Sequence, residues 1–353
     1  MSYKQLPIPS FFNSKNGTDW NYRPSQMTLF ARAMEWKKEH GIKPAASDAF
    51  KIHLLVIDGQ KDFMYPEGTL YVPGRSGDGA TKDMVRISEF IYRNLPYITD
   101  ITTTLDTHFL YQIFFPWFWL DKHDNPLHPF RELLTDEIRS GDVKPNPAIT
   151  TWLCNGNYPW LLKQVLHYTT ELERAGKYKL FLWPPHCLLR SGGHALAGLL
   201  EEATMFHGLI RGCQSNCEVK GGHPLTENYS VLRPEVLTRW DGNPLVQKNA
   251  AFFQKLLVAD AIVIMGEADS HCVMSSIDDL LTEICAVDPK LAKKVHVVTD
   301  CMSSVVVRDA SGNVLVDYTP KAQDAHQRFA DRNMNLVEST RPLEDWNGVA
   351  LVA

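Results

Sequence analysis

The stretch AIVIMGEADSHCVMSSIDDLLTEICA (residues 261–286) joins a strand pattern to a helix pattern through one short turn. Its first seven residues are a mainly apolar run of strand length, and residues 271–286 have the apolar spacing of an amphipathic helix. Cys272 stands where that helix begins. A strand followed directly by a helix is typical of α/β folds with a parallel sheet.

Other parts of the chain repeat this alternation. Helix patterns occupy residues 81–95 and 243–258, between runs rich in β-branched residues. We therefore expect a three-layer α/β sandwich on a mainly parallel, Rossmann-like sheet. Its remaining predicted strands are residues 53–58 (HLLVID), 98–106 (ITDITTTLD) and 294–300 (KVHVVTD).

Two regions do not fit the alternation. Residues 1–48 carry Pro, Asn and Ser ahead of a single helix pattern and predict an N-terminal extension. Residues 109–178 are rich in aromatic residues and proline, and they are too long for an ordinary connection. We predict that they form a structured insertion within one domain of residues 49–353.

Composition excludes several classes of function. The 36 basic and 41 acidic residues give a net charge of −5 without a block of like charge, so we expect neither nucleic acid nor a membrane as partner. The first residues lack the pattern of a signal peptide, and seven cysteines, an odd number, do not form a disulfide framework. The sequence therefore predicts a cytoplasmic protein with free thiols.

Reactive side chains stand at the ends of the predicted strands, where parallel strands place a ligand. Asp58 ends the first strand, and Asp106 and His108 end the second. Being two residues apart, Asp106 and His108 share one face of an extended chain, and His186 in LFLWPPHC is the best third partner. One carboxylate with two imidazoles suits zinc, iron or manganese, although an Asp that only orients a His gives the same pattern. Cys272, likewise, is either a nucleophile or a small buried residue.

VIDGQKDF (residues 56–63) and GEADSHCV (residues 266–273) together resemble the cysteine hydrolase superfamily of nicotinamidases and isochorismatase-like proteins. The resemblance implies the isochorismatase-like hydrolase fold and a catalytic triad of Asp58, Lys220 and Cys272. Lys220 lies in VKGGHPLTENYS, which is similar to the lysine segment of that superfamily.

The nicotinamidase branch holds a metal ion through Asp-x-His and Trp-Pro-x-His-Cys, and this chain has DTH and WPPHC in the same order. By resemblance, Asp106, His108 and His186 are ligands of one divalent ion, zinc in the first place, with iron or manganese as alternatives. In that branch the ion binds the pyridine nitrogen of nicotinamide and orients the substrate.

The resemblance also implies how the site would work. The thiol of Cys272 attacks a small amide, and the backbone N–H groups of Ala268 and Cys272 form the oxyanion hole next to a cis peptide bond between Glu267 and Ala268. Phe63, Trp183 and Tyr229 match positions that wall the substrate ring, with packing in the core as the alternative role.

The sequence differs from the family pattern at positions that bear on the choice of substrate, while the triad residues are all present. A long segment separates His108 from Trp183, and His271 replaces the usual apolar residue before the nucleophile; we expect His271 to cap the helix or face solvent. The sequence predicts a cysteine-dependent amidohydrolase, with nicotinamide cleaved to nicotinate and ammonia as the first candidate reaction. Another small amide, carbamoyl or ureido compound is the second candidate, and a noncatalytic small-molecule binding protein is the third. We expect a homo-oligomer, with the extension and the insertion suited to an interface.

Overall fold

A parallel sheet of six strands forms the centre of the molecule. The computed structural model describes residues 4–176, 178–309 and 311–351. The strands are ordered β12-β9-β8-β1-β2-β7, and every neighbouring pair is parallel. The strands are β1 (Ile52–Ile57), β2 (Ile98–Asp106), β7 (Asn216–Lys220), β8 (Ala261–Gly266), β9 (Val295–Val298) and β12 (Asn335–Val337).

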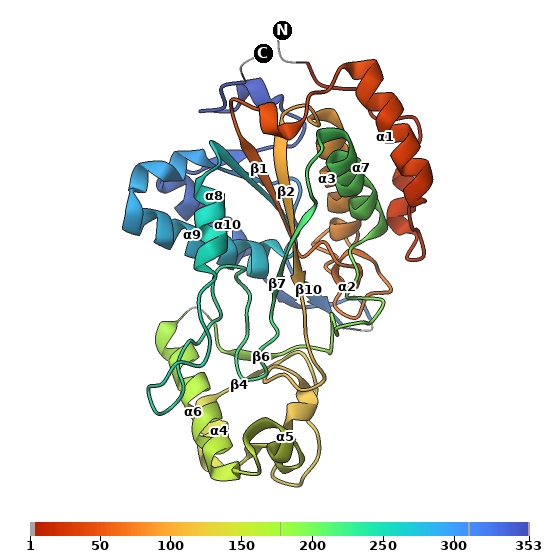
Figure 1. Cartoon of the computed structure of the whole chain (residues 1–353). Coiled ribbons are helices and arrows are strands. Elements are labelled where there is room, and N and C mark those ends of the chain that lie inside the picture. Colours follow the sequence, from red (N-terminus) through yellow and green to blue (C-terminus); the bar gives the residue numbers. More distant parts are fainter. Residues whose placement is uncertain (1–3, 177, 310, 352–353) are drawn as a thin grey trace.

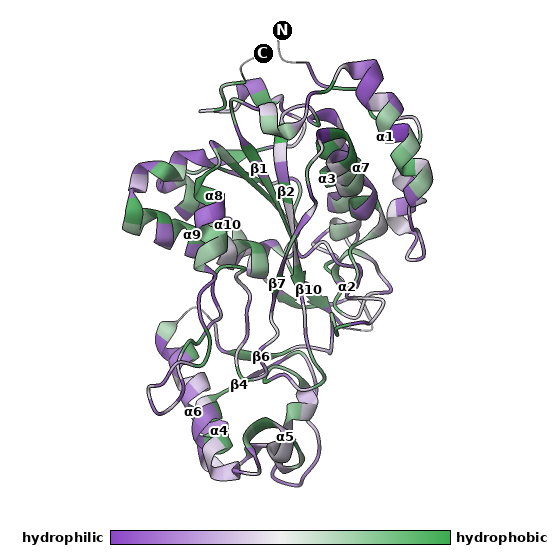
Figure 2. Cartoon of the chain, viewed as in Figure 1, coloured by the Kyte–Doolittle hydropathy of each residue, from purple (hydrophilic) through white to green (hydrophobic). Residues whose placement is uncertain are grey.

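Helices cover both faces of this sheet, as Figure 1 shows. The residues of β1 and β8 are buried throughout, because each face of the sheet packs against helices. Figure 2 shows the central strands as mainly hydrophobic, and helices such as α9 as a mixture of hydrophilic and hydrophobic residues. The three-layer α/β sandwich is therefore confirmed. The covering helices are α3 (Gly79–Arg93) and α7 (Gly198–Arg211) on one face, and α8 (Ala250–Leu257), α9 (Met274–Val287) and α10 (Thr319–Asp331) on the other.

The N-terminal segment packs onto the first of these helical layers. Helix α1 (Gln26–His40) lies outside α7 (Figure 1) and buries Leu29 and Ala33. Two short 3-10 turns flank it, η1 (Ser14–Thr18) and η2 (Ala45–Ser47). Arg211 of α7 donates to the Asp48 carboxylate, so polar contacts also join this segment to the sheet domain.

A second lobe lies beyond the carboxyl ends of the sheet strands (Figure 1). Its two small antiparallel sheets pair β3 with β5 and β4 with β6. Fully buried aromatic side chains, among them Phe114, Phe118, Trp119 and Tyr168, give it its core. The elements are η3 (Pro116–Phe118), β3 (Trp119–Asp121), β4 (Arg131–Leu133), α4 (Thr135–Ser140), β5 (Val143–Pro145), η4 (Pro147–Ile149), α5 (Thr150–Cys154), α6 (Tyr158–Ala175) and β6 (Leu180–Leu182).

The segment between β7 and α8 completes this lobe. The Ile113 N–H donates to the carbonyl of Pro224 (2.8 Å), and the Trp240 N–H donates to Gln164 Oε1 (3.0 Å). The lobe therefore combines residues 109–183 with residues 221–249, which lie after the predicted insertion.

Several predicted boundaries differ from the structure. The helix predicted at residues 243–258 begins only at Ala250, because the Asn249 side chain caps it by accepting from the Phe252 N–H. Strands β7 and β12 were not predicted. The other elements are α2 (Lys61–Met64), the hairpin β10 (Val306–Arg308) and β11 (Val314–Asp317), and the turns η5 (Asp269–Val273), η6 (Pro289–Lys294) and η7 (Leu343–Asp345).

Within the described part of the chain, no helix has the length and apolarity needed to cross a bilayer.

Candidate active site

Cys272 lies on the turn that joins β8 to α9. After Gly266 the chain passes through a cis peptide bond between Glu267 and Ala268, at the predicted position, and then through the π-helical turn η5. Gly266 has φ +120°, and a Cβ there would lie 2.1 Å from the Ile57 carbonyl oxygen, so only glycine fits. This tight crossing over β1 brings the cysteine close to the end of that strand.

Asp58, Lys220 and Cys272 meet at the carboxyl ends of β1, β7 and β8. Lys220 Nζ lies 2.8 Å from Asp58 Oδ2 and 3.6 Å from Cys272 Sγ. All three side chains are buried, and Asp58 is fixed by Thr104, whose hydroxyl donates to its carboxylate and accepts from its N–H (2.9 Å). The structure therefore places together three residues that the sequence separates by more than two hundred positions.

Burial and neighbouring charges shift the pKa of each of these groups. Burial raises the pKa of the Cys272 thiol well above its ordinary value, although the Lys220 ammonium opposes this. Burial also raises the pKa of Asp58, again against Lys220. Burial lowers the pKa of Lys220, but Asp106 and Asp58 outweigh burial and hold that pKa well above the ordinary range. This geometry therefore holds a neutral thiol, which needs a base to remove its proton.

The three predicted metal ligands form one buried cluster, with a donor atom from each within 4.8 Å of the others. Asp106 Oδ2 lies 2.9 Å from His108 Nε2 and 3.6 Å from His186 Nε2. The Nδ1 atoms of the two rings face backbone carbonyls, Gly221 O at 3.1 Å and Pro184 O at 2.8 Å. Because a carbonyl only accepts, a neutral ring keeps its hydrogen on Nδ1 and presents a lone pair from Nε2. Two lone pairs and a carboxylate thus face one another, and a divalent cation fits this donor set.

Residues of the first strand's end support this cluster. The Gln60 side chain accepts from the Asp106 N–H (2.7 Å) and donates to its carbonyl (2.8 Å). Asp62 Oδ2 accepts from the Cys187 N–H (2.7 Å), next to His186. Gly221 is required because a Cβ would lie 2.7 Å from both Asp106 Oδ1 and the His108 ring. These residues hold the two ligand segments in place.

A pocket opens between the cysteine and the metal-ligand cluster. Phe63, Trp183 and Tyr229 all line it, together with Cys272 and Ala268, and the Trp183 indole N–H donates to the Tyr229 hydroxyl (2.9 Å). The structure therefore brings the predicted ring-wall residues to one pocket, which the predicted oxyanion donors Ala268 and Cys272 also line.

Two further residues of the pocket were missed or misplaced by sequence reasoning. His271, expected at a helix cap or in solvent, is buried in the pocket wall, stacked on Tyr178 with ring centroids 5.5 Å apart. Burial lowers the pKa of His271 to about 3, so the ring is neutral. Glu227 also lines the pocket, and burial raises its pKa well above the ordinary value. The sequence could have indicated Glu227 as a pocket residue, because it lies two residues before the predicted ring-wall residue Tyr229.

No protein-family model and no curated protein matches the sequence. Among solved structures, the chain is similar to an Acinetobacter baumanii nicotinamidase/pyrazinamidase, with 18% identity, a TM-score of 0.48, and 82% of this chain and 96% of that chain covered. It is also similar to the yeast nicotinamidase (19%, TM-score 0.49, 81% and 99% covered) and to the pyrazinamidase of Pyrococcus horikoshii in complex with zinc (16%, TM-score 0.41, 81% and 98% covered). At such low identity, the function of this chain has to be argued from its own residues.

Proposed function

We propose that the protein is a cysteine-dependent amidohydrolase that cleaves the C–N bond of a small amide through a thioester. The observation that carries this proposal is the contact of Lys220 Nζ with both Asp58 Oδ2 (2.8 Å) and Cys272 Sγ (3.6 Å), at the base of a pocket walled by aromatic residues. A buried thiol, carboxylate and ammonium in mutual contact match what nucleophilic catalysis on an amide requires.

The proposed reaction begins at the thiol. Asp58 takes the thiol proton as the sulfur of Cys272 bonds to the amide carbon, and the backbone N–H groups of Ala268 and Cys272 receive the developing oxyanion. The C–N bond then breaks, and Asp58 gives the proton to departing ammonia. Water attacks the thioester with Asp58 as base, which releases the acid and restores the thiol. Lys220 keeps Asp58 oriented and stabilises the thiolate as it forms.

The first candidate substrate is nicotinamide, because the aromatic side chains of Phe63, Trp183 and Tyr229 line the pocket and such side chains pack against a flat ring. A divalent ion at Asp106, His108 and His186 would supply a Lewis acid that anchors an acceptor atom of the substrate. Zinc is the first candidate, because a carboxylate with two imidazoles is an ordinary zinc donor set.

The test is ammonia release from nicotinamide and from a panel of small amides and ureides by metal-analysed protein. We expect Cys272→Ala to lower kcat by at least about a thousandfold and to retain substrate binding, because it removes the nucleophile only. Cys285→Ala, a matched change on the following helix α9, should keep the parent rate.

Ammonia release that persists in Cys272→Ala would refute the proposed nucleophile. Release from a different panel member alone would keep the mechanism and change the substrate. Binding without turnover across the whole panel would favour the noncatalytic binding protein.

A further inference from the structure

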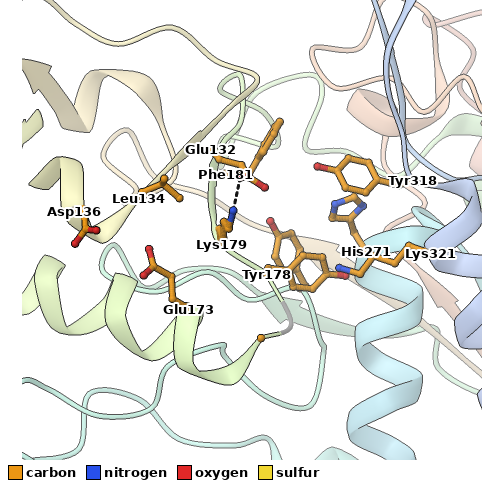
Figure 3. Close-up of a pocket in the computed structure, with 12 residues that line it drawn as sticks. Glu132, Leu134, Asp136, Glu173, Tyr178, Lys179, Phe181, His271, Tyr318 and Lys321 are labelled. Carbon is orange, nitrogen blue, oxygen red and sulfur yellow. Dashed lines mark hydrogen bonds and ion pairs between the residues drawn. The ribbon is translucent and has the colours of Figure 1, made fainter.

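The nucleophile turn, residues 267–272, is held from two sides. On one side lies a cavity of about 510 Å³, drawn in Figure 3. There the Tyr178 ring stacks on His271, and the Tyr178 hydroxyl donates to the carbonyl of Ser270 (3.0 Å). Toward α3 and the segment that follows β9, the turn presents Glu267. Because this side chain has no contact with solvent, its partners inside the protein determine what it does.

Two carboxyl groups, those of Glu267 and Asp83, meet at a single residue, Ser303. The Ser303 N–H donates to Glu267 Oε2 (3.2 Å), and the Ser303 hydroxyl donates to Asp83 Oδ2. Both carboxyl groups are fully buried. Arg86 Nη2 lies 2.5 Å from Asp83 Oδ1, and this is the only ion pair that the described residues form with either carboxyl group. One positive charge therefore faces two buried carboxyl groups, so one of the two has to keep its proton.

The hydrogen bonds indicate that Glu267 is the group that keeps the proton. Glu267 Oε1 is buried, and no N–H or O–H group of the described residues donates to it. Asp83, in contrast, accepts from Arg86 and from Ser303 with its two oxygens. A hydrogen on Glu267 that is donated to the Asp83 carboxylate satisfies both groups. Burial and the charge of Asp83 accordingly raise the pKa of Glu267 well above its ordinary value, whereas Ser303 and Arg86 oppose the effect of burial on the pKa of Asp83.

Ser303 also holds the residues on both sides of Ala268. Its N–H binds the Glu267 side chain, and its carbonyl accepts from the Asp269 N–H (2.8 Å). Ala268 lies between these two residues, and its N–H is a proposed oxyanion donor. Asp83 on α3 fixes Ser303 through the serine hydroxyl, so a closed set of buried hydrogen bonds surrounds Ala268. A donor that is fixed in this way needs no rearrangement when the oxyanion develops.

We propose that Glu267 is a positioning residue, which donates its carboxyl hydrogen to Asp83 and thereby fixes the Ala268 N–H where the oxyanion of the reaction develops. This inference rests on the proposed amidohydrolase function and adds to it a set of residues behind the site. None of Glu267, Asp83 and Ser303 lines the active-site pocket. They act on the chemical step, because a misplaced donor weakens binding of the transition state more than binding of the substrate.

The experiment compares two changes of Glu267 in the full-length, metal-loaded protein, with nicotinamide or another panel amide that the parent protein cleaves. Glu267→Gln keeps an N–H donor for Asp83, and we expect kcat within about threefold of the parent value. Glu267→Met removes the donor at similar side-chain length. We expect kcat to fall about a hundredfold while KM stays within about threefold, because the oxyanion donors act in the transition state. Glu344→Met, at an exposed position of η7, is the matched control and should keep both constants.

A second measurement tests the oxyanion donors without turnover. Nicotinaldehyde adds to the thiol of Cys272: the sulfur bonds to the carbonyl carbon, and the carbonyl oxygen takes the thiol proton and lies at the donors. We expect Glu267→Met to weaken the affinity for this aldehyde about tenfold or more. Ser303→Ala removes only the hydroxyl that binds Asp83 and should weaken the affinity in the same direction. This smaller change decides the question if Glu267→Met does not fold.

Parent values of kcat and aldehyde affinity in Glu267→Met and Ser303→Ala would overturn the positioning role, even if both variants unfold at lower urea concentration. An equal loss of kcat in Glu267→Gln would also overturn it, because that variant keeps the donor. The proposed function fails separately, if the parent protein releases no ammonia from any amide of the panel and binds nicotinaldehyde no better than Cys272→Ala does.

Discussion

At the scale of single residues, the backbone of the candidate site is built from unusual conformations. Asp58 is a non-glycine residue with φ +44°, held there by its two hydrogen bonds with Thr104. A non-glycine residue with positive φ raises the free energy of the folded state, so this conformation persists only where the surroundings fix it, often at functional sites. This strained backbone conformation therefore lies at the proposed general base, whose carboxylate contacts Lys220.

Gly266→Ala should lower the free energy of unfolding by more than about 4 kcal/mol, because its Cβ would overlap the Ile57 carbonyl. Gly141→Ala, also at positive φ but with nothing within 4 Å of the added Cβ, should cost only about 1–2 kcal/mol. Urea unfolding of the two variants measures the difference. Equal costs would mean that the β8 end is not packed against β1 as described.

Buried histidines make stability depend on pH. His207 of α7 is buried with Nε2 2.8 Å from the Ile98 carbonyl, and burial lowers its pKa to about 4. An unfolded histidine titrates at about 6.5, so between these values the unfolded chain binds a proton that the folded chain excludes. The free energy of unfolding therefore falls as the pH falls from about 6.5 toward 4, by about 2 kcal/mol at pH 5 for this residue.

His207→Gln should lose this contribution, so its stability should fall about 2 kcal/mol less than that of the parent between pH 7 and pH 5. His128→Gln, at an exposed position, should follow the parent. Unfolding by urea at both pH values gives the comparison, and an unchanged slope in His207→Gln would show that another group accounts for the loss.

At the scale of elements, the strands that could be predicted are those with a local sequence pattern. The four predicted strands correspond to β1, β2, β8 and β9, whose apolar or β-branched residues are mostly buried in the sheet. The edge strands β7 and β12 were not predicted, because they are only five and three residues long and are partly exposed. Lys220 was found through resemblance alone, since nothing in the periodicity marks β7 as a strand.

The side chains of the site were predictable where a motif names them, as in DTH and WPPHC. His271 was not, because its burial depends on Tyr178 and Tyr318, which come from the second lobe and from the segment before α10. No local pattern reveals a contact between segments so far apart in sequence.

Helix α1 is an integral part of the folded domain. Leu29→Ala should lower the free energy of unfolding by about 2–3 kcal/mol, since Leu29 is 3% exposed against the sheet domain. Phe30→Ala, one residue away on the outer face and 46% exposed, should change it by less than about 0.5 kcal/mol. Thermal or urea unfolding tests this pair; equal, small effects would mean that α1 detaches in solution.

A metal ion held by Asp106, His108 and His186 would join two elements, the end of β2 and the segment after β6. Zinc at a free concentration one hundred times its Kd should raise the free energy of unfolding by about 2.7 kcal/mol. His186→Ala should abolish this gain and lower the bound metal by elemental analysis, whereas His194→Ala, on a neighbouring loop, should keep both. Stabilisation by zinc that persists in His186→Ala would place the ion elsewhere.

At the scale of the whole molecule, two separate stretches of chain build the second lobe. Residues 109–178 were predicted as an insertion, but residues 221–249 complete the lobe and were not assigned to it. The sheet domain thus places Asp58, Lys220 and Cys272 at its strand ends, and the second lobe lies beyond them.

The strand order has a consequence for how the protein is made. Strand β1 pairs on one side with β2, which follows soon in the chain, and on the other with β8, which follows roughly two hundred residues later. At a synthesis rate of about 5–20 residues per second, the ribosome needs on the order of ten to forty seconds to supply β8. Throughout that time the nascent chain presents IHLLVI with one open edge, a segment well suited to pairing with another copy. Aggregation through this edge would therefore arise during translation, before the stability of the finished molecule has any influence.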